Sequence, residues 1–175
     1  MSHPRAFLAA LVTAALLAGT APLSAQPAIA PAEPPLGKAA DNRIYAQQLV
    51  NDLLAANSDL LAVGLHAIPP GSTEYVIVAH LRDLIGKKDS EVDVEMIKNE
   101  QTVIGAETTG YTTTPRMVVH ETLRDSQGRS IGLAVLSFRL APDTTKLSAH
   151  VRSDALLQAL SHKIPDAAAL FRPTH

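Results

Sequence analysis

The feature of this sequence that most constrains its fold is a pair of long β-prone runs separated by a short polar turn. The runs are Met117–Arg124 and Arg129–Leu140, and the turn between them is Asp125–Gly128. So short a connection makes the two runs pair as antiparallel neighbours. Gly128 supplies the positive φ that a turn of this length needs. The sequence therefore predicts a β-hairpin in this region.

The turn also predicts which residues of the two strands lie opposite each other. If Arg124 pairs with Arg129, then Val119 pairs with Ala134. Side chains alternate between the two faces of a strand, so a slip of one residue would exchange the faces. We therefore expect Val119 and Ala134 to share one face of the sheet.

Three segments carry the signals of helices. Asp41–Asn57 repeats apolar residues at a spacing of about 3.6 behind an aspartate that can cap the helix. In Ser90–Glu100, the serine and an aspartate three residues later form a capping box. Lys146–Lys163 carries five aliphatic residues and stops before Pro165. We expect the buried side of the middle helix to be Val92, Met96 and Ile97.

The sequence outside this hairpin predicts three further strands. Leu60–Ile68 and Tyr75–Leu81 are β-rich runs that flank a Pro/Gly turn, and both are apolar on two faces, which favours interior strands. Residues 102–114 are rich in threonine and predict a loop that leads into a strand at Tyr111. The order is helix, two strands, short helix, three strands, helix. It is typical of an α+β domain with helices packed on one antiparallel sheet.

This order of elements resembles the PAS-like fold of extracytoplasmic single Cache sensor domains. The segment Leu123–Gly132 is similar to their final hairpin, which runs apolar-x-Asp-x-x-Gly-x-x-Ile-Gly before an apolar strand. The resemblance spans roughly Ala39–Lys163. It implies a PAS/Cache-like antiparallel sheet with a long N-terminal helix, a short middle helix and a C-terminal helix. It also implies a domain that binds or senses small molecules outside the cytoplasm.

The N-terminus has the pattern of a signal peptide. Arg5 precedes the apolar stretch Ala6–Gly19, which has 14 residues. A membrane span needs about 18–20 apolar residues, whereas a signal-peptide core needs about 7–15. A small residue, Ala25, stands before Gln26, which favours cleavage between them. The alternative is that this stretch is not cleaved and serves as a membrane anchor. In the rest of the sequence, no window is long and apolar enough to span a bilayer.

These signals divide the chain into four parts. Residues 1–25 form the expected signal peptide, and the proline-rich residues 26–38 form an extended, flexible spacer. We expect residues 39–165 to form the α+β domain and residues 166–175 to form a C-terminal tail.

Composition excludes several classes of function. The formal net charge of −2 gives no basic surface for nucleic acid. Without cysteine, the chain has no disulfide, thiolate metal site or iron–sulfur cluster. The sequence His120-Glu-Thr-Leu-Arg124 lacks the second histidine of a zinc protease, and no Gly-x-Ser-x-Gly elbow is present. We therefore expect no catalytic activity and no resident cofactor.

Three histidines lie inside predicted strands and are candidate ligand-binding residues: His66, His80 and His120. Imidazoles can hold a transition metal or haem. The alternative is three histidines that are satisfied by hydrogen bonds, one in each strand, and this second interpretation is the more common one. We predict no metal site from them.

Cations form a second group of candidates. Lys87 and Lys88 precede the middle helix, whose N-terminus carries a partial positive charge, and Arg116 begins the strand that would run below that helix. Together they could hold an organic anion. The alternative is a solvated basic loop that Asp83, Asp89 and Glu91 neutralise.

Tyr111 and Glu121 complete the candidate ligand-binding residues. In the expected register Glu121 lies opposite Gly132, which leaves room beside the carboxylate. An exposed strand face would explain Glu121 equally well.

Together these features predict an exported, periplasmic or secreted α+β domain that binds a small molecule, such as an organic anion, and has no catalytic activity. Two alternatives remain open. One is a periplasmic protein that binds haem or a metal. The other is a ligand-free adaptor with a membrane-protein partner, which an exposed apolar patch on the first helix would favour.

The apolar stretch before Ala25 generates a first prediction. The exported protein should begin at Gln26, because a core of this length is recognised and then removed. Intact-mass measurement of protein recovered from the extracytoplasmic fraction checks this expectation. Recovery of the full-length chain in the membrane fraction would support the anchor instead.

Overall fold

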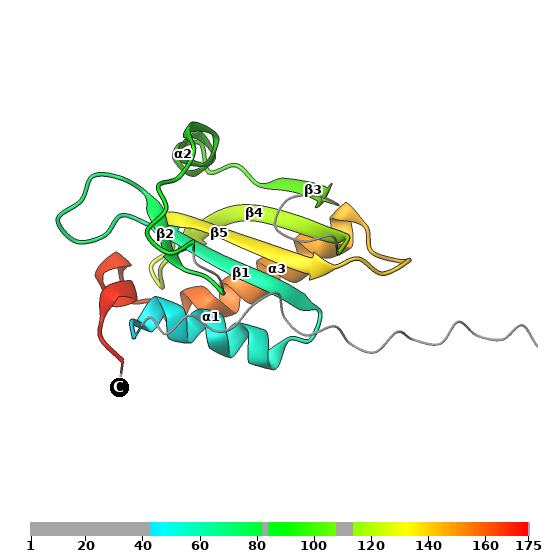
Figure 1. Cartoon of the computed structure of the whole chain (residues 1–175), viewed down its shortest axis with the longest axis horizontal. Helices are drawn as coiled ribbons and strands as arrows, with labels where there is room; N and C mark the ends of the chain where they lie inside the picture. Colours follow the sequence, from blue (N-terminus) through cyan, green and yellow to red (C-terminus); the bar gives the residue numbers. More distant parts are fainter. Residues whose placement is uncertain (1–42, 82–83, 108–113, 175) are drawn as a thin grey trace, which may run out of the picture. The chain divides into compact units, whose positions relative to one another are not determined.

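The fold is seen in a computed structural model that describes residues 43–81, 84–107 and 114–174 (Figure 1). The predicted signal peptide, the spacer and Tyr111 lie outside these residues. The helices and strands follow one another as α1 (Tyr45–Ala56), β1 (Leu60–Ala67), β2 (Val76–Ala79), α2 (Glu91–Lys98), β3 (Val103–Glu107), β4 (Arg116–Arg124), β5 (Ser130–Arg139), α3 (Lys146–Ser161) and the 3-10 helix η1 (Ala167–Phe171).

All strands join one antiparallel sheet in the order β2-β1-β5-β4-β3. Helices α1 and α3 lie along one face of this sheet, and α2 lies on the other side (Figure 1). The predicted α+β class, with one antiparallel sheet, a long first helix, a short middle helix and a C-terminal helix, is therefore confirmed. None of the helices in the described ranges is both long enough and apolar enough to cross a membrane.

The core lies between the sheet and the pair α1 and α3. Leu65, Val119 and Leu136 point from three adjacent strands into this layer and are fully buried. Leu49 of α1 and Leu160 of α3 pack against them. Burial of each such side chain contributes about 1.5–3 kcal/mol to stability. The apolar side chains on one face of the sheet therefore supply most of the hydrophobic stabilisation of the domain.

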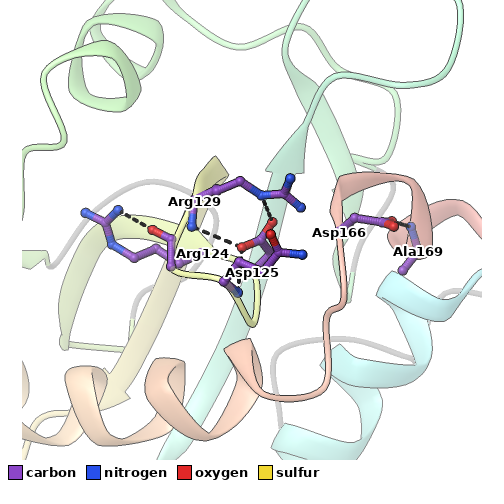
Figure 2. Close-up of polar contacts among 7 residues, drawn as sticks. Arg124, Asp125, Arg129, Asp166 and Ala169 are labelled. Atoms are coloured by element: carbon purple, nitrogen blue, oxygen red, sulfur yellow. Dashed lines mark hydrogen bonds and ion pairs between the residues drawn. The ribbon is translucent and has the colours of Figure 1, made fainter.

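The turn between β4 and β5 is as predicted at Gly128, whose φ is +79°. Asp125 is buried and closes the turn, because its carboxylate accepts hydrogen bonds from the backbone N–H of Gln127 and Arg129 and from the side chain of Arg129 (Figure 2). Burial raises the pKa of Asp125, but these hydrogen bonds and the Arg129 charge outweigh it and hold the pKa below its ordinary 3.8. Arg124 donates to the carbonyl of Gly128 at 3.0 Å from outside the turn (Figure 2).

The expected register of this hairpin is wrong by two residues along most of the strands and by one residue beside the turn. Val119 pairs with Leu136 rather than with Ala134, and Arg124 pairs with Ser130 rather than with Arg129. A β-bulge at Leu123/Arg124 inserts an extra residue beside the turn and raises the shift from one residue at Arg124 to two from Leu123 onward. Because the shift is even from Leu123 back to Arg116, the side chains of that part of β4 keep their expected faces.

Two strands differ from the expectation. Residues Val103–Glu107 form strand β3 where the sequence predicts a loop. Their backbone groups pair with β4 along the whole segment, and this pairing outweighs the turn-forming tendency of the glycine and threonines. Strand β2 is an edge strand rather than an interior one, since β1 is its only neighbour among the strands of the described residues.

The helices also differ in detail. The capping box of Ser90 and Asp93 is confirmed at α2, but Val92 is 60% exposed instead of buried. The N-cap of α1 is Ile44, and Asp41 lies outside the described residues. Gln47 of α1 is fully buried, although the sequence places it off the apolar stripe.

The chain remains packed beyond Pro165, where the sequence predicts a tail. Asp166 caps η1 through the N–H of Ala169 at 2.8 Å (Figure 2). Leu170 is fully buried, and the N–H of Tyr45 donates to the carbonyl of Arg172 at 2.9 Å. Residues 166–174 therefore belong to the folded domain and cover the start of α1.

Gly132 marks the closest approach of two strands and generates the second prediction. A Cβ atom on Gly132 would lie 1.9 Å from the backbone oxygen of His66, so Gly132→Ala must push β5 away from β1. We expect a loss of at least about 2 kcal/mol in the free energy of unfolding, measured in urea. Gly105→Ala is the matched control, because its Cβ would meet nothing within 4 Å. Equal stability of the two variants would contradict this packing.

Candidate functional site

A cavity of about 380 Å³ lies on the side of the sheet that faces α2. Strands β1, β4 and β5 form its floor, and the segment that leads into α2 forms its wall. Its lining residues are His66, Ile77, His80, Leu84, Lys87, Lys88, Asp89, Ser90, Asp93, Glu107, Arg116, Val118, His120, Val135 and Ser137. The cavity therefore occupies the face of the sheet that α1 and α3 do not cover.

A histidine and a carboxylate form the most buried polar pair of the cavity. Nδ1 of His66 and Oδ1 of Asp89 lie 2.9 Å apart, and the Asp89 side chain is 0% exposed. The second carboxylate oxygen, Oδ2, has no hydrogen-bond partner in the described structure. If Nδ1 of His66 donates to the carboxylate, its Nε2 remains an acceptor.

His80 lies beside this pair. A Cβ atom on Gly64 would lie 3.1 Å from Cδ2 of His80 and 3.4 Å from Nε2 of His66, so both rings stand over the same glycine. The backbone N–H of His80 donates to the buried Oε1 of Gln47 at 3.0 Å. This hydrogen bond therefore connects the end of β2 to α1 and holds the backbone of His80 in place.

His120 lies on β4 in the floor of the cavity, opposite Val135 on β5. Burial lowers the pKa of His120 below its ordinary 6.5, although the nearby carboxylates of Asp93 and Glu107 partly oppose the shift. The imidazole is therefore neutral at pH 7 and can both donate and accept a hydrogen bond.

The cations of the cavity lie close to acids. Nη2 of Arg116 and Oε2 of Glu107 are 2.6 Å apart, and the Arg116 side chain is 8% exposed. Lys88 forms an exposed ion pair with Glu74. Lys87 also lines the cavity. The wall thus carries cations and anions in near balance.

Six of the eight residues that the sequence proposes line this one cavity: His66, His80, Lys87, Lys88, Arg116 and His120. Tyr111 lies outside the described residues. Glu121 lies on the opposite face, where it accepts a hydrogen bond from Ser153 of α3 at 2.7 Å. It pairs with Ala134 rather than with Gly132, because of the two-residue shift in register.

Sequence analysis missed the acids of the cavity. The sequence suggests that Asp89 neutralises a solvated loop, yet its side chain is fully buried and contacts a histidine 23 residues away. Glu107 lies on β3, a strand that the sequence did not predict. The position of Asp89 directly before a capping box could have indicated that this residue has a fixed place, since the cap determines where the helix begins.

The described residues contain no group of three or more histidine or acidic side chains placed to hold a metal ion. The three histidines share the cavity but are not arranged around a common point there. The apolar patch that would favour an adaptor is also placed differently: Leu147 and Val151, 71% and 62% exposed, lie on α3, not on the first helix.

No protein-family model and no curated protein matches this chain. Among solved structures, a type II free methionine-R-sulfoxide reductase from Thermoplasma acidophilum is 12% identical with a TM-score of 0.43, covering 67% of this chain and 89% of that one. A light-oxygen-voltage domain studied with a flavin analogue is 14% identical with a TM-score of 0.35, covering 62% of this chain and 96% of that one. The α+β assignment above rests on this chain's own helices and strand order.

The environment of His120 generates the third prediction. Since its folded-state pKa is lowered, the unfolded state binds more protons below pH 6.5, and stability falls as the pH drops through this range. Urea unfolding of the wild type at about pH 7.5 and 5.5 should show this loss. The loss should be smaller in His120→Gln. The exposed His162→Gln is the control and should behave like the wild type.

Proposed function

We propose that this chain is an exported, periplasmic or secreted domain that binds a small polar molecule and has a sensory role without catalysis. The observation that carries this proposal is the polar cavity on the free face of the sheet. Its volume, about 380 Å³, falls in the range of about 300–1,000 Å³ that small-molecule sites occupy. Buried charged groups cost stability, so a fold that keeps several around a cavity is typical of a binding site.

The wall of the cavity suits a polar organic solute. Arg116 and Lys88 each contact a glutamate, and three histidines add groups that can donate or accept hydrogen bonds. The organic anion that the sequence suggests would contact Lys87 and Arg116. The extracytoplasmic location rests on the N-terminal apolar stretch.

The fourth prediction tests the cavity. A thermal-shift screen of organic acids, amines, amino acids and sugars should find a compound that raises the melting temperature, and the shift should grow with ligand concentration. Ser137→Leu fills the floor of the cavity and should weaken binding at least tenfold. Ser130→Leu is the matched control, because Ser130 lies on the same strand but is exposed.

Three outcomes would contradict this proposal. One is binding that Ser137→Leu leaves unchanged, which would place the ligand elsewhere. A second is stabilisation by zinc or haem alone, lost in His66→Ala and His120→Ala, which would favour the metal alternative. The third is an absence of any shift, together with a membrane protein that co-purifies with the chain and is released by Leu147→Glu on the exposed patch of α3.

A further inference from the structure

Asp89 is a buried carboxylate, and one of its two oxygens has no hydrogen-bond partner in the described structure. Its side chain is 0% exposed, and Oδ1 contacts His66. Oδ2 is buried too and has no partner among the described residues. An ionised oxygen removed from water without a partner is costly, so native proteins rarely keep one unless something fills the position.

The neighbours of Asp89 in the chain are committed to other contacts. Nζ of Lys88 forms its ion pair with Glu74. Oγ of Ser90 donates to Oδ2 of Asp93 at 2.7 Å within the capping box. The backbone N–H of Asp89 donates to the carbonyl of Tyr75 at 3.1 Å, which holds the residue in place. The carboxylate is therefore fixed at the cavity wall.

The charge around Asp89 indicates what kind of group would fill the position. Two further carboxylates, Asp93 and Glu107, line the same cavity. Of the cations there, Arg116 contacts Glu107 and Lys88 contacts Glu74. These two cations thus contact glutamates, whereas the Asp89 carboxylate contacts the imidazole of His66 among the described residues.

We propose that the cavity takes a small organic amine in its protonated form, whose ammonium group donates a hydrogen bond to Oδ2 of Asp89. A hydrogen bond between a cationic donor and a carboxylate is short and strong, so it can offset the burial of Asp89. An ammonium group carries three donors. Nε2 of His66, which is an acceptor when Nδ1 donates to Asp89, lies over Gly64 in the cavity floor. This inference rests on the proposed function and specifies its ligand class.

The experiment uses three probes of equal carbon count: propylammonium, propionate and propan-1-ol. Titration calorimetry and thermal shift are measured on the mature chain. Propylammonium should bind and raise the melting temperature, while the other two should bind at least tenfold more weakly. Asp89→Asn should weaken propylammonium binding at least tenfold. The substitution removes the negative charge that attracts the ammonium group, and it replaces one accepting oxygen by an NH₂ group that can only donate. Asp143→Asn, an exposed acid outside the cavity, is the matched control and should bind like the wild type.

A measurement on the wild type keeps the inference testable if Asp89→Asn does not fold. The carboxyl carbon of Asp89 should shift in the NMR spectrum when propylammonium is added, and should not shift with propionate. Propylammonium binding without this shift would overturn the inference, as would binding that survives Asp89→Asn.

The two proposals fail in different ways. If another compound binds and Ser137→Leu abolishes its binding, while propylammonium has no effect, then the binding function stands and the amine is wrong. If a crystal soaked in propylammonium shows only a water on Oδ2, the amine is also wrong. If no compound binds at all, the binding function itself fails.

Discussion

The pairing of β5 with β1 on one side and β4 on the other is the interaction on which the rest of the structure depends. These three strands form the centre of the sheet, and their alternation gives it two different faces. The pairing is close enough that only glycine fits at position 132, beside the His66 carbonyl. Any loss of this register would move both the core and the cavity residues.

The two faces of the sheet differ in what they carry, since one lines the hydrophobic core and the other lines the cavity. On one face, leucines and valines pack against α1 and α3 and supply the hydrophobic stabilisation of the domain. On the other face, the same strands present His66, Arg116 and His120 to a cavity below α2. Polar groups of this kind cost stability, and the apolar face offsets that cost. The helices on one side thus allow the opposite side to remain polar.

The connection between β2 and α2 brings Asp89 to that polar face. The capping box of Ser90 and Asp93 sets the start of α2 and places Asp89 directly before it. Hydrogen bonds from this segment to the backbone of Tyr75 and Ile77 hold it along the edge strand. The histidine on β1 and the carboxylate before α2 therefore meet because an edge strand and a helix cap are anchored to each other.

The sequence by itself determined the features that depend on near neighbours. These are the hairpin with its positive-φ Gly128, the capping box of α2 and the apolar stripe of α1, since each is decided within a few residues. It also identified six residues of the cavity by type, but as separate groups. Only the tertiary structure decided that β3 is a strand, that Gln47 is buried against His80 and that Asp89 meets His66. Those outcomes depend on partners that are distant in the chain, and local propensity carries no information about them.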